Sequence, residues 1–108
     1  MNVISNNSKK CGVALTALRE VMDPEIGLNV VDLGLIYQVD FDEPNKSVFC
    51  TMTLTTQFCP MGESITDAAR EALKNAFPGY EPVINLTFDP HWNQGMISEE
   101  GLQYLNER

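Results

Sequence analysis

Apolar residues recur at helical spacing in two long segments of the chain. The first segment, residues 11–22, predicts a helix that must end near Asp23, because Pro24 disfavours helical geometry in the residue before it. The second segment, residues 65–76, predicts another helix, which ends at the Pro-Gly pair of the sequence FPGY. Both helices have one apolar stripe, so each is expected to cover a second layer of structure.

Between and after these helices, apolar and polar residues alternate with the period of a strand. The first alternating run starts at Asp32, and its expected inner face consists of Leu33, Leu35, Tyr37, Val39 and Phe41. The second run has an expected inner face of Val48, Cys50, Met52 and Leu54. The turn-forming sequence DEPNK joins the two runs, which predicts an antiparallel hairpin. The sequence EPVINLTFD predicts a third strand, with Ile84, Leu86 and Phe88 on one side.

A short last helix is expected from Ser98, which is a good N-cap residue, although Gly101 weakens it. The order is therefore helix, strand, strand, helix, strand, helix. This order predicts a small two-layer α+β domain, in which helices cover mainly one face of a sheet. We expect residues 1–9 to form a flexible polar tail and residues 10–108 to form this single domain.

Composition and charge narrow the class of protein. The chain has 108 residues and a formal net charge of −8, and it has no cluster of Lys or Arg side chains. An acidic surface repels phosphate backbones, so nucleic acid is not an expected partner. No signal sequence and no apolar run long enough to span a bilayer is visible, so we expect a soluble, cytoplasmic protein with no membrane association.

The three cysteines have no spacing typical of a zinc site or a disulfide framework. Cys50 alternates with core residues and Cys11 lies on the apolar stripe of the first helix, so both are expected to fill the core. Cys59 differs, because Pro60 suits the first turn of a helix and would place Cys59 at the N-cap. The positive end of a helix favours a thiolate, which is a nucleophile and a ligand for soft metals. The alternative is a half-buried cysteine that serves as a small hydrophobe.

Other polar residues could contribute to a site near Cys59. Thr55 and Thr56 lead up to the cysteine, although threonine is also typical of an exposed strand face. In the sequence DPE, Asp23 and Glu25 could be ligands, bases or docking charges, or they could form a turn. Asp32 carries the same ambiguity, His91 alone makes a poor metal site, and Trp92 is expected to seal the edge of the core. Nucleotide-binding loops and the nucleophile elbow are absent from the sequence.

Three stretches together resemble the iron-sulfur cluster assembly family of SufT and PaaD-like proteins. They are ALREVMDPEIGLNVVDLGLIYQV, TMTLTTQFCPMGESI and INLTFDPHWNQGMISEEGLQYL, and they occur in the order and spacing typical of the family. The likeness as a whole runs over about residues 12–105. The resemblance implies an α+β domain of the cluster-assembly type that works in the maturation of iron-sulfur proteins. It places the site on Asp23, Glu25, Thr55, Thr56 and Cys59.

The resemblance also implies partners and cargo. A stable iron-sulfur cluster usually takes four thiolates, so one chain with one candidate thiol is expected to bind no cluster stably. Cys59 would hold iron or a cluster only transiently, with further thiols from a second copy, a small thiol or a target protein. The expected partners are apo iron-sulfur proteins and other assembly factors, and a homodimer is one arrangement that supplies two thiols.

Three functional hypotheses remain open on the sequence. The first is a non-enzymatic adaptor or transient carrier that acts through Cys59, and the second is an accessory subunit of a phenylacetate-type multicomponent oxygenase. The third is a thiol enzyme with Asp23 or Glu25 as the base, which is the least favoured because a carboxylate is a modest base for a thiol.

Overall fold

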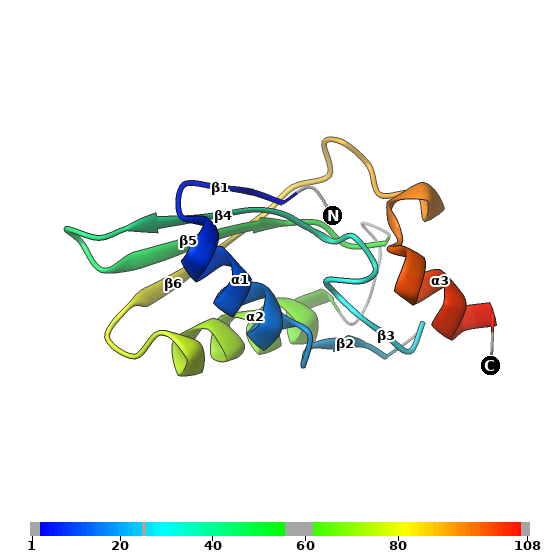
Figure 1. Cartoon of the computed structure of the whole chain (residues 1–108), viewed down its shortest axis with the longest axis horizontal. Coiled ribbons are helices and arrows are strands. Elements are labelled where there is room, and N and C mark those ends of the chain that lie inside the picture. The colour runs from blue at the N-terminus through cyan, green and yellow to red at the C-terminus, as the bar shows by residue number, and fades with distance from the viewer. Residues whose placement is uncertain (1–2, 25, 56–61, 107–108) are drawn as a thin grey trace.

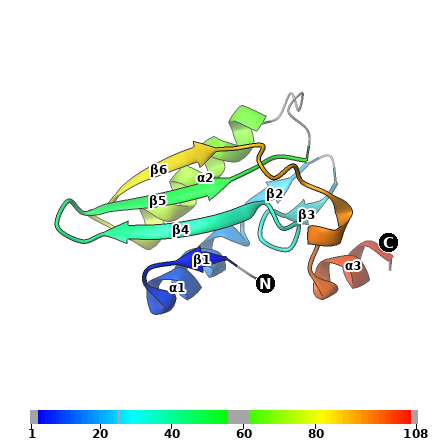
Figure 2. The ribbon, with the colours of Figure 1, turned by 90° about the horizontal axis from the view of Figure 1, so that it is seen from above.

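The structure is a computed structural model that describes residues 3–24, 26–55 and 62–106. A four-stranded sheet forms one layer and two helices cover one of its faces (Figures 1 and 2), which confirms the predicted two-layer α+β class. The strands lie in the order β1-β4-β5-β6. Their bounds are Ile4–Ser5 for β1, Ile36–Asp42 for β4, Ser47–Met52 for β5 and Glu81–Leu86 for β6. The covering helices are α1 at Ser8–Leu18 and α2 at Gly62–Ala76.

The predicted hairpin is confirmed, because β4 and β5 pair in antiparallel orientation. The expected inner face of the second run is buried throughout, from Val48 to Leu54 in steps of two. The face assigned to the first run is wrong at two positions. The register shifts between Ile36 and Gln38, so that Tyr37 is an extra residue opposite the regular pairs of β5. Ile36 is therefore buried, whereas Tyr37 is only half-buried.

The first predicted strand also starts later than expected, because the chain turns before it. Gly34 has a φ of +82°, a left-handed conformation that glycine adopts without steric cost. The amide of Gly34 donates to the carbonyl of Val31 at 3.0 Å and closes this turn. The strand can begin only after it, at Ile36.

The first helix is shifted toward the N-terminus relative to the prediction. It begins after Asn7, whose side chain accepts a hydrogen bond from the amide of Lys10, and it ends at Leu18. Residues 3–9, expected to be a flexible tail, instead contribute β1 and the first residues of α1. Ile4 and Ser5 pair in parallel with Gln38 and Val39 of β4.

The predicted stripe of the second helix is confirmed, since Ile65, Ala69 and Leu73 are buried against the sheet. Its C-terminal end is followed by Phe77, whose ring meets that of Phe41 edge to face, with centroids 5.1 Å apart. β6 then pairs in parallel with β5. The apolar side expected for this strand is only partly covered, because Leu86 is 46% exposed.

Three further elements gather at the end of the molecule opposite the β4–β5 turn (Figure 1). They are a two-stranded pair formed by β2 at Met22–Asp23 and β3 at Leu28–Asn29, a short 3-10 helix η1 at Gln94–Met96, and α3 at Glu99–Asn106. None of the helices within the described ranges has the length and apolar character needed to cross a membrane.

Candidate functional site

Asp23, the first residue of the sequence DPE, lies in the pair formed by β2 and β3 and is 1% exposed. One carboxylate oxygen, Oδ1, accepts a hydrogen bond from the amide of Ile26 at 3.3 Å. Its backbone carbonyl accepts another from Gly27 at 2.8 Å, and Gly27 has a φ of +80°. Asp23 therefore shapes the tight turn that connects β2 to β3. Its burial rules out the docking-charge alternative, because such a charge must lie on the surface.

A relay of backbone hydrogen bonds links this turn to the end of β5. The amide of Val30 donates to the carbonyl of Val21 at 2.9 Å, and the amide of Leu35 donates to the carbonyl of Val30 at 3.0 Å. The amide of Thr53 then donates to the carbonyl of Leu35 at 2.9 Å. Thr55, which is half-buried, follows two residues later. The relay thus links the β2–β3 pair, which contains Asp23, to the C-terminal end of β5, and both lie at the end of the molecule opposite the β4–β5 turn (Figures 1 and 2).

Three of the five predicted site residues, Glu25, Thr56 and Cys59, lie outside the described residues. The structure describes α2 from Gly62 onward, and Cys59 stands three positions before it in the sequence. The position of Cys59 at a helix N-cap stays a prediction, as does its role as a ligand.

The other two cysteines fill the core, as predicted. Cys11 is 6% exposed and Cys50 is fully buried. Burial, with a smaller contribution from Cys11, raises the pKa of the Cys50 thiol to about 12. Neither thiol is therefore placed to act as a ligand on the surface.

The first and third sequence motifs meet in space through Asp32 and Ser98. The amide of Ser98 donates to the carbonyl of Asp32 at 2.7 Å, and its hydroxyl donates to Oδ1 of Asp32 at 3.0 Å. Ser98 also caps α3 as predicted, because its Oγ accepts a hydrogen bond from the amide of Gly101 at 3.0 Å. Asp32 is thus the residue that ties the start of α3 to the chain before β4.

Two further contacts dock residues 87–106, here called the C-terminal arm, on the same segment. Trp92 donates from Nε1 to the carbonyl of Leu33 at 2.7 Å, which confirms that it packs at the core edge. Gly34 lies against the backbone of Met96 so closely that a Cβ atom on it would be 2.2 Å from the Met96 carbonyl oxygen. A larger residue at position 34 would therefore displace the arm.

Tyr37 completes the docking of the arm. Its hydroxyl donates to the carbonyl of Pro90 at 2.9 Å. Burial raises the pKa of Tyr37, and a hydrogen bond with Thr53 opposes part of that shift. The phenol therefore stays protonated, and a donor, throughout the neutral range.

A groove of about 990 Å³ opens between the arm and the body of the domain. Its lining combines apolar side chains with a few charged ones, and it includes Arg19, Ile36, Tyr37, Met96, Glu99 and Glu100. Both glutamates are exposed. Within the described residues, no group of three or more His, Cys, Asp or Glu side chains is arranged to hold a metal ion. His91 is exposed in the arm.

Comparison with known proteins decides the family. A sequence profile described as "Iron-sulfur cluster assembly protein" matches residues 13–83. The chain belongs to this family. The match includes the turn at Asp23, the segment from Asp32 to Tyr37, β5 and α2, and it ends within β6.

Relatives of this family member carry names from the same process. The chain is 45% identical over 88 residues to an Fe-S protein maturation auxiliary factor of Porphyromonas gingivalis, and the match covers 82% of this chain and 83% of that protein. It is 38% identical to the Fe-S protein maturation auxiliary factor SufT of Staphylococcus aureus, over 72% of this chain and 88% of that protein. Neither name describes an enzyme.

A solved structure confirms the fold. The crystal structure of a domain of unknown function from Bacillus anthracis superimposes with a TM-score of 0.84 at 31% identity. The similarity covers 94% of this chain and all of that domain. The C-terminal arm beyond the profile match is therefore part of a shared architecture.

Reasoning from the sequence missed how the motifs fit together. The sequence leaves the role of Asp32 ambiguous and gives no sign of the role of Gly34. No local pattern in the sequence pairs Asp32 with Ser98 or Gly34 with Met96. Only the fold shows that these partners, about sixty positions apart, touch.

Proposed function

We propose that this chain is an accessory factor in the maturation of iron-sulfur proteins, acting as an adaptor or transient carrier through Cys59. The observation that carries the proposal is the backbone relay from Val21 to Thr53, in a member of the iron-sulfur cluster assembly family. The relay links the turn of Asp23 to the end of β5, and Thr55 and Cys59 follow β5 in the sequence. The names of the relatives support the same process.

The chemistry limits how such a carrier works. Cys11 and Cys50 are buried, so Cys59 is the one remaining thiol of the three in the sequence. An iron-sulfur cluster usually takes four thiolates, and the cluster is therefore cargo rather than a resident group. In a handover, the iron bond to the Cys59 thiolate is exchanged for a bond to a cysteine thiolate of the client. The exchange needs no oxidant or reductant.

The surface near this end suits an adaptor. Glu99 and Glu100 are exposed at the start of α3, and both line the groove beside the C-terminal arm. Apo iron-sulfur proteins and other assembly factors are the proposed partners. A second copy of the chain would supply a second thiolate to the same cluster.

The experiment compares Cys59→Ala with Cys11→Ala, which removes a buried thiol instead. Each variant is purified without oxygen, mixed with ferrous iron and sulfide, and monitored by its visible absorbance. Each is also expressed in cells that lack the wild-type protein, and the activity of cellular iron-sulfur enzymes is measured. We expect Cys59→Ala to fail in the cellular assay and Cys11→Ala to restore it. Full enzyme activity with Cys59→Ala would overturn the role of this thiol.

A further inference from the structure

Asp32 connects the start of α3 to β3 by side-chain hydrogen bonds. Its Oδ1 accepts from the hydroxyl of Ser98 at the start of α3, at 3.0 Å. Its Oδ2 accepts from the side-chain amide of Asn29 in β3, at 2.7 Å. Its own backbone amide donates to Oδ1 of Asn29 at 2.9 Å. All three bonds are partly buried, and those to the carboxylate are charge-assisted, the stronger kind of protein hydrogen bond.

Asn29 lies one residue pair away from Asp23 in the two-stranded sheet. Asn29 pairs with Met22, and the next pair along the same two strands is Leu28 with Asp23. A second contact runs in parallel, because Gly101 of α3 lies against Leu28. A Cβ atom on Gly101 would be 2.9 Å from Cδ2 of Leu28. The start of α3 therefore contacts Leu28 directly through Gly101 and reaches Asn29 through Asp32. Each of these two β3 residues pairs with a residue of β2.

We propose that Asp32 is a positioning residue for the site, and that it fixes the turn of Asp23 by joining the C-terminal arm to β3. The inference rests on the proposed function for its biological meaning, but its structural part is testable without iron. In this arrangement the arm is not only a cover for the core edge. It holds the β2–β3 pair, and with it the turn of Asp23, in place beside the backbone relay that runs to Thr53 after β5.

The competing account is that Asp32 only adds stability to the whole fold. The two accounts predict different results when the hydrogen bond from Ser98 to Asp32 is removed. Ser98→Ala removes the hydroxyl that bonds Asp32 and caps α3, and the structure gives it no hydrogen bond to β2 or β3. A general loss of stability would affect all slowly exchanging amides equally, whereas a positioning role would affect the β2–β3 turn first.

Amide hydrogen exchange of the full chain separates them. In Ser98→Ala, we expect the amides of Ile26 and Gly27 to exchange roughly fivefold faster than in the wild type, the change that one lost hydrogen bond produces. The amides that pair β4 with β5 should exchange at the wild-type rate when conditions keep global unfolding rare. Ser98→Thr should restore the slow exchange, because threonine also caps helices.

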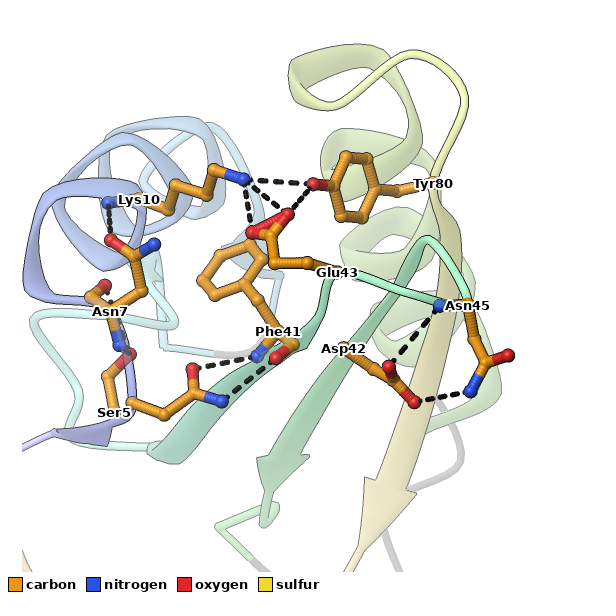
Figure 3. A network of polar contacts seen from close by, with 9 residues as sticks. Ser5, Asn7, Lys10, Phe41, Asp42, Glu43, Asn45 and Tyr80 are labelled. Atoms are coloured by element: carbon orange, nitrogen blue, oxygen red, sulfur yellow. Dashed lines mark hydrogen bonds and ion pairs between the residues drawn. The ribbon is translucent and has the colours of Figure 1, made fainter.

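A matched control is available at the opposite end of the molecule. There, Lys10 bonds both Glu43 and the hydroxyl of Tyr80, and Tyr80 also bonds Glu43 (Figure 3). Glu43→Gln disturbs a polar network of similar size, whose side-chain hydrogen bonds join Lys10, Glu43 and Tyr80 and do not involve β2 or β3. We expect this variant to leave the exchange of Ile26 and Gly27 unchanged.

The same variants are then tested for the activity of iron-sulfur enzymes in cells. Ser98→Ala should lower it, and Ser98→Thr and Glu43→Gln should not.

Uniform acceleration of all amides, or no acceleration at the turn, would overturn the positioning role and leave the proposed role of Cys59 untouched. Faster exchange at the turn with full cellular activity would show that the position of the turn does not matter for function. Full activity of iron-sulfur enzymes with Cys59→Ala would instead overturn the proposed role of Cys59, while the exchange result would stand.

Discussion

Gly34 and Met96 are in backbone contact, although they lie in separate parts of the chain. A Cβ atom on Gly34 would be 2.2 Å from the carbonyl oxygen of Met96 and 2.8 Å from its carbonyl carbon. Backbone atoms cannot move aside as the end of a flexible side chain can. Gly34 therefore sets how closely the C-terminal arm approaches the strand β4.

Gly34→Ala should destabilise the protein by about 3 kcal/mol. About 1 kcal/mol comes from the left-handed backbone, and about 2 kcal/mol from the forced displacement of the arm. Gly79→Ala is the matched control, because Gly79 has a φ of +90° and nothing within 4 Å of the added Cβ atom. It should cost only about 1 kcal/mol. Urea unfolding of both variants measures the difference, and equal losses would contradict the contact with Met96.

Trp92→Phe tests the hydrogen bond to Leu33. Phenylalanine keeps an aromatic ring at the core edge but has no N-H group, so the carbonyl of Leu33 loses its 2.7 Å partner. We expect a loss of about 1 to 2 kcal/mol in the free energy of unfolding, monitored by circular dichroism. Tyr104→Phe is the control, because Tyr104 is 50% exposed on α3, and it should change the stability by less than about 0.5 kcal/mol. A loss for Trp92→Phe no larger than that of the control would show that this bond does not stabilise the arm.

The pKa of Cys50 predicts a loss of stability at high pH. Burial raises the pKa of this thiol from 9.0 to about 12, so the folded state keeps the proton that the unfolded state releases. The contribution is fully present below pH 9.0 and is lost as the pH rises toward 12, with a slope of up to about 1.4 kcal/mol per pH unit. Cys50→Ala should have a shallower decline over this range than the wild type, although it is less stable at pH 7 because of the cavity. Parallel curves for the two proteins would contradict the shift.

The sequence predicted those parts of the fold that follow a regular period. Val48 and Cys50 face the core because β5 alternates without interruption, and Ile65 and Leu73 lie on one stripe of α2. The prediction failed at Tyr37, where one extra residue reverses the alternation. A bulge depends on the partner strand and leaves no trace in a local pattern.

The sequence predicts which residues form the candidate site, but it carries no information on how they are arranged. The sequence indicates Asp23 through the turn sequence DPE and Thr55 through its place before Cys59, whereas the link between their segments depends on the carbonyl of Leu35 accepting from Thr53. That bond joins segments that are far apart in the sequence. The same holds for Ser98, whose capping role is local and visible, whereas its bond to Asp32 is not.

Asp23→Asn tests whether the candidate site needs a carboxylate or only a turn. The amide oxygen of asparagine can still accept from Ile26, so the turn should be kept and the unfolding free energy should fall by about 1 to 2 kcal/mol at most. If the charge contributes to cluster handover, the activity of cellular iron-sulfur enzymes should fall by about tenfold, the size typical of a supporting residue around a metal.

The control for this variant is Asp67→Asn. Asp67 lies on the exposed face of α2, where its side chain is 62% exposed and pairs with Arg70. Such a surface pair contributes little to stability, so this variant should leave both the fold and the enzyme activities unchanged. Both variants remove one negative charge, so a general effect of net charge would affect them equally. Wild-type activity in Asp23→Asn would assign Asp23 a purely structural role in the turn. The reason is that this substitution removes the negative charge but keeps an oxygen that accepts the hydrogen bond from Ile26.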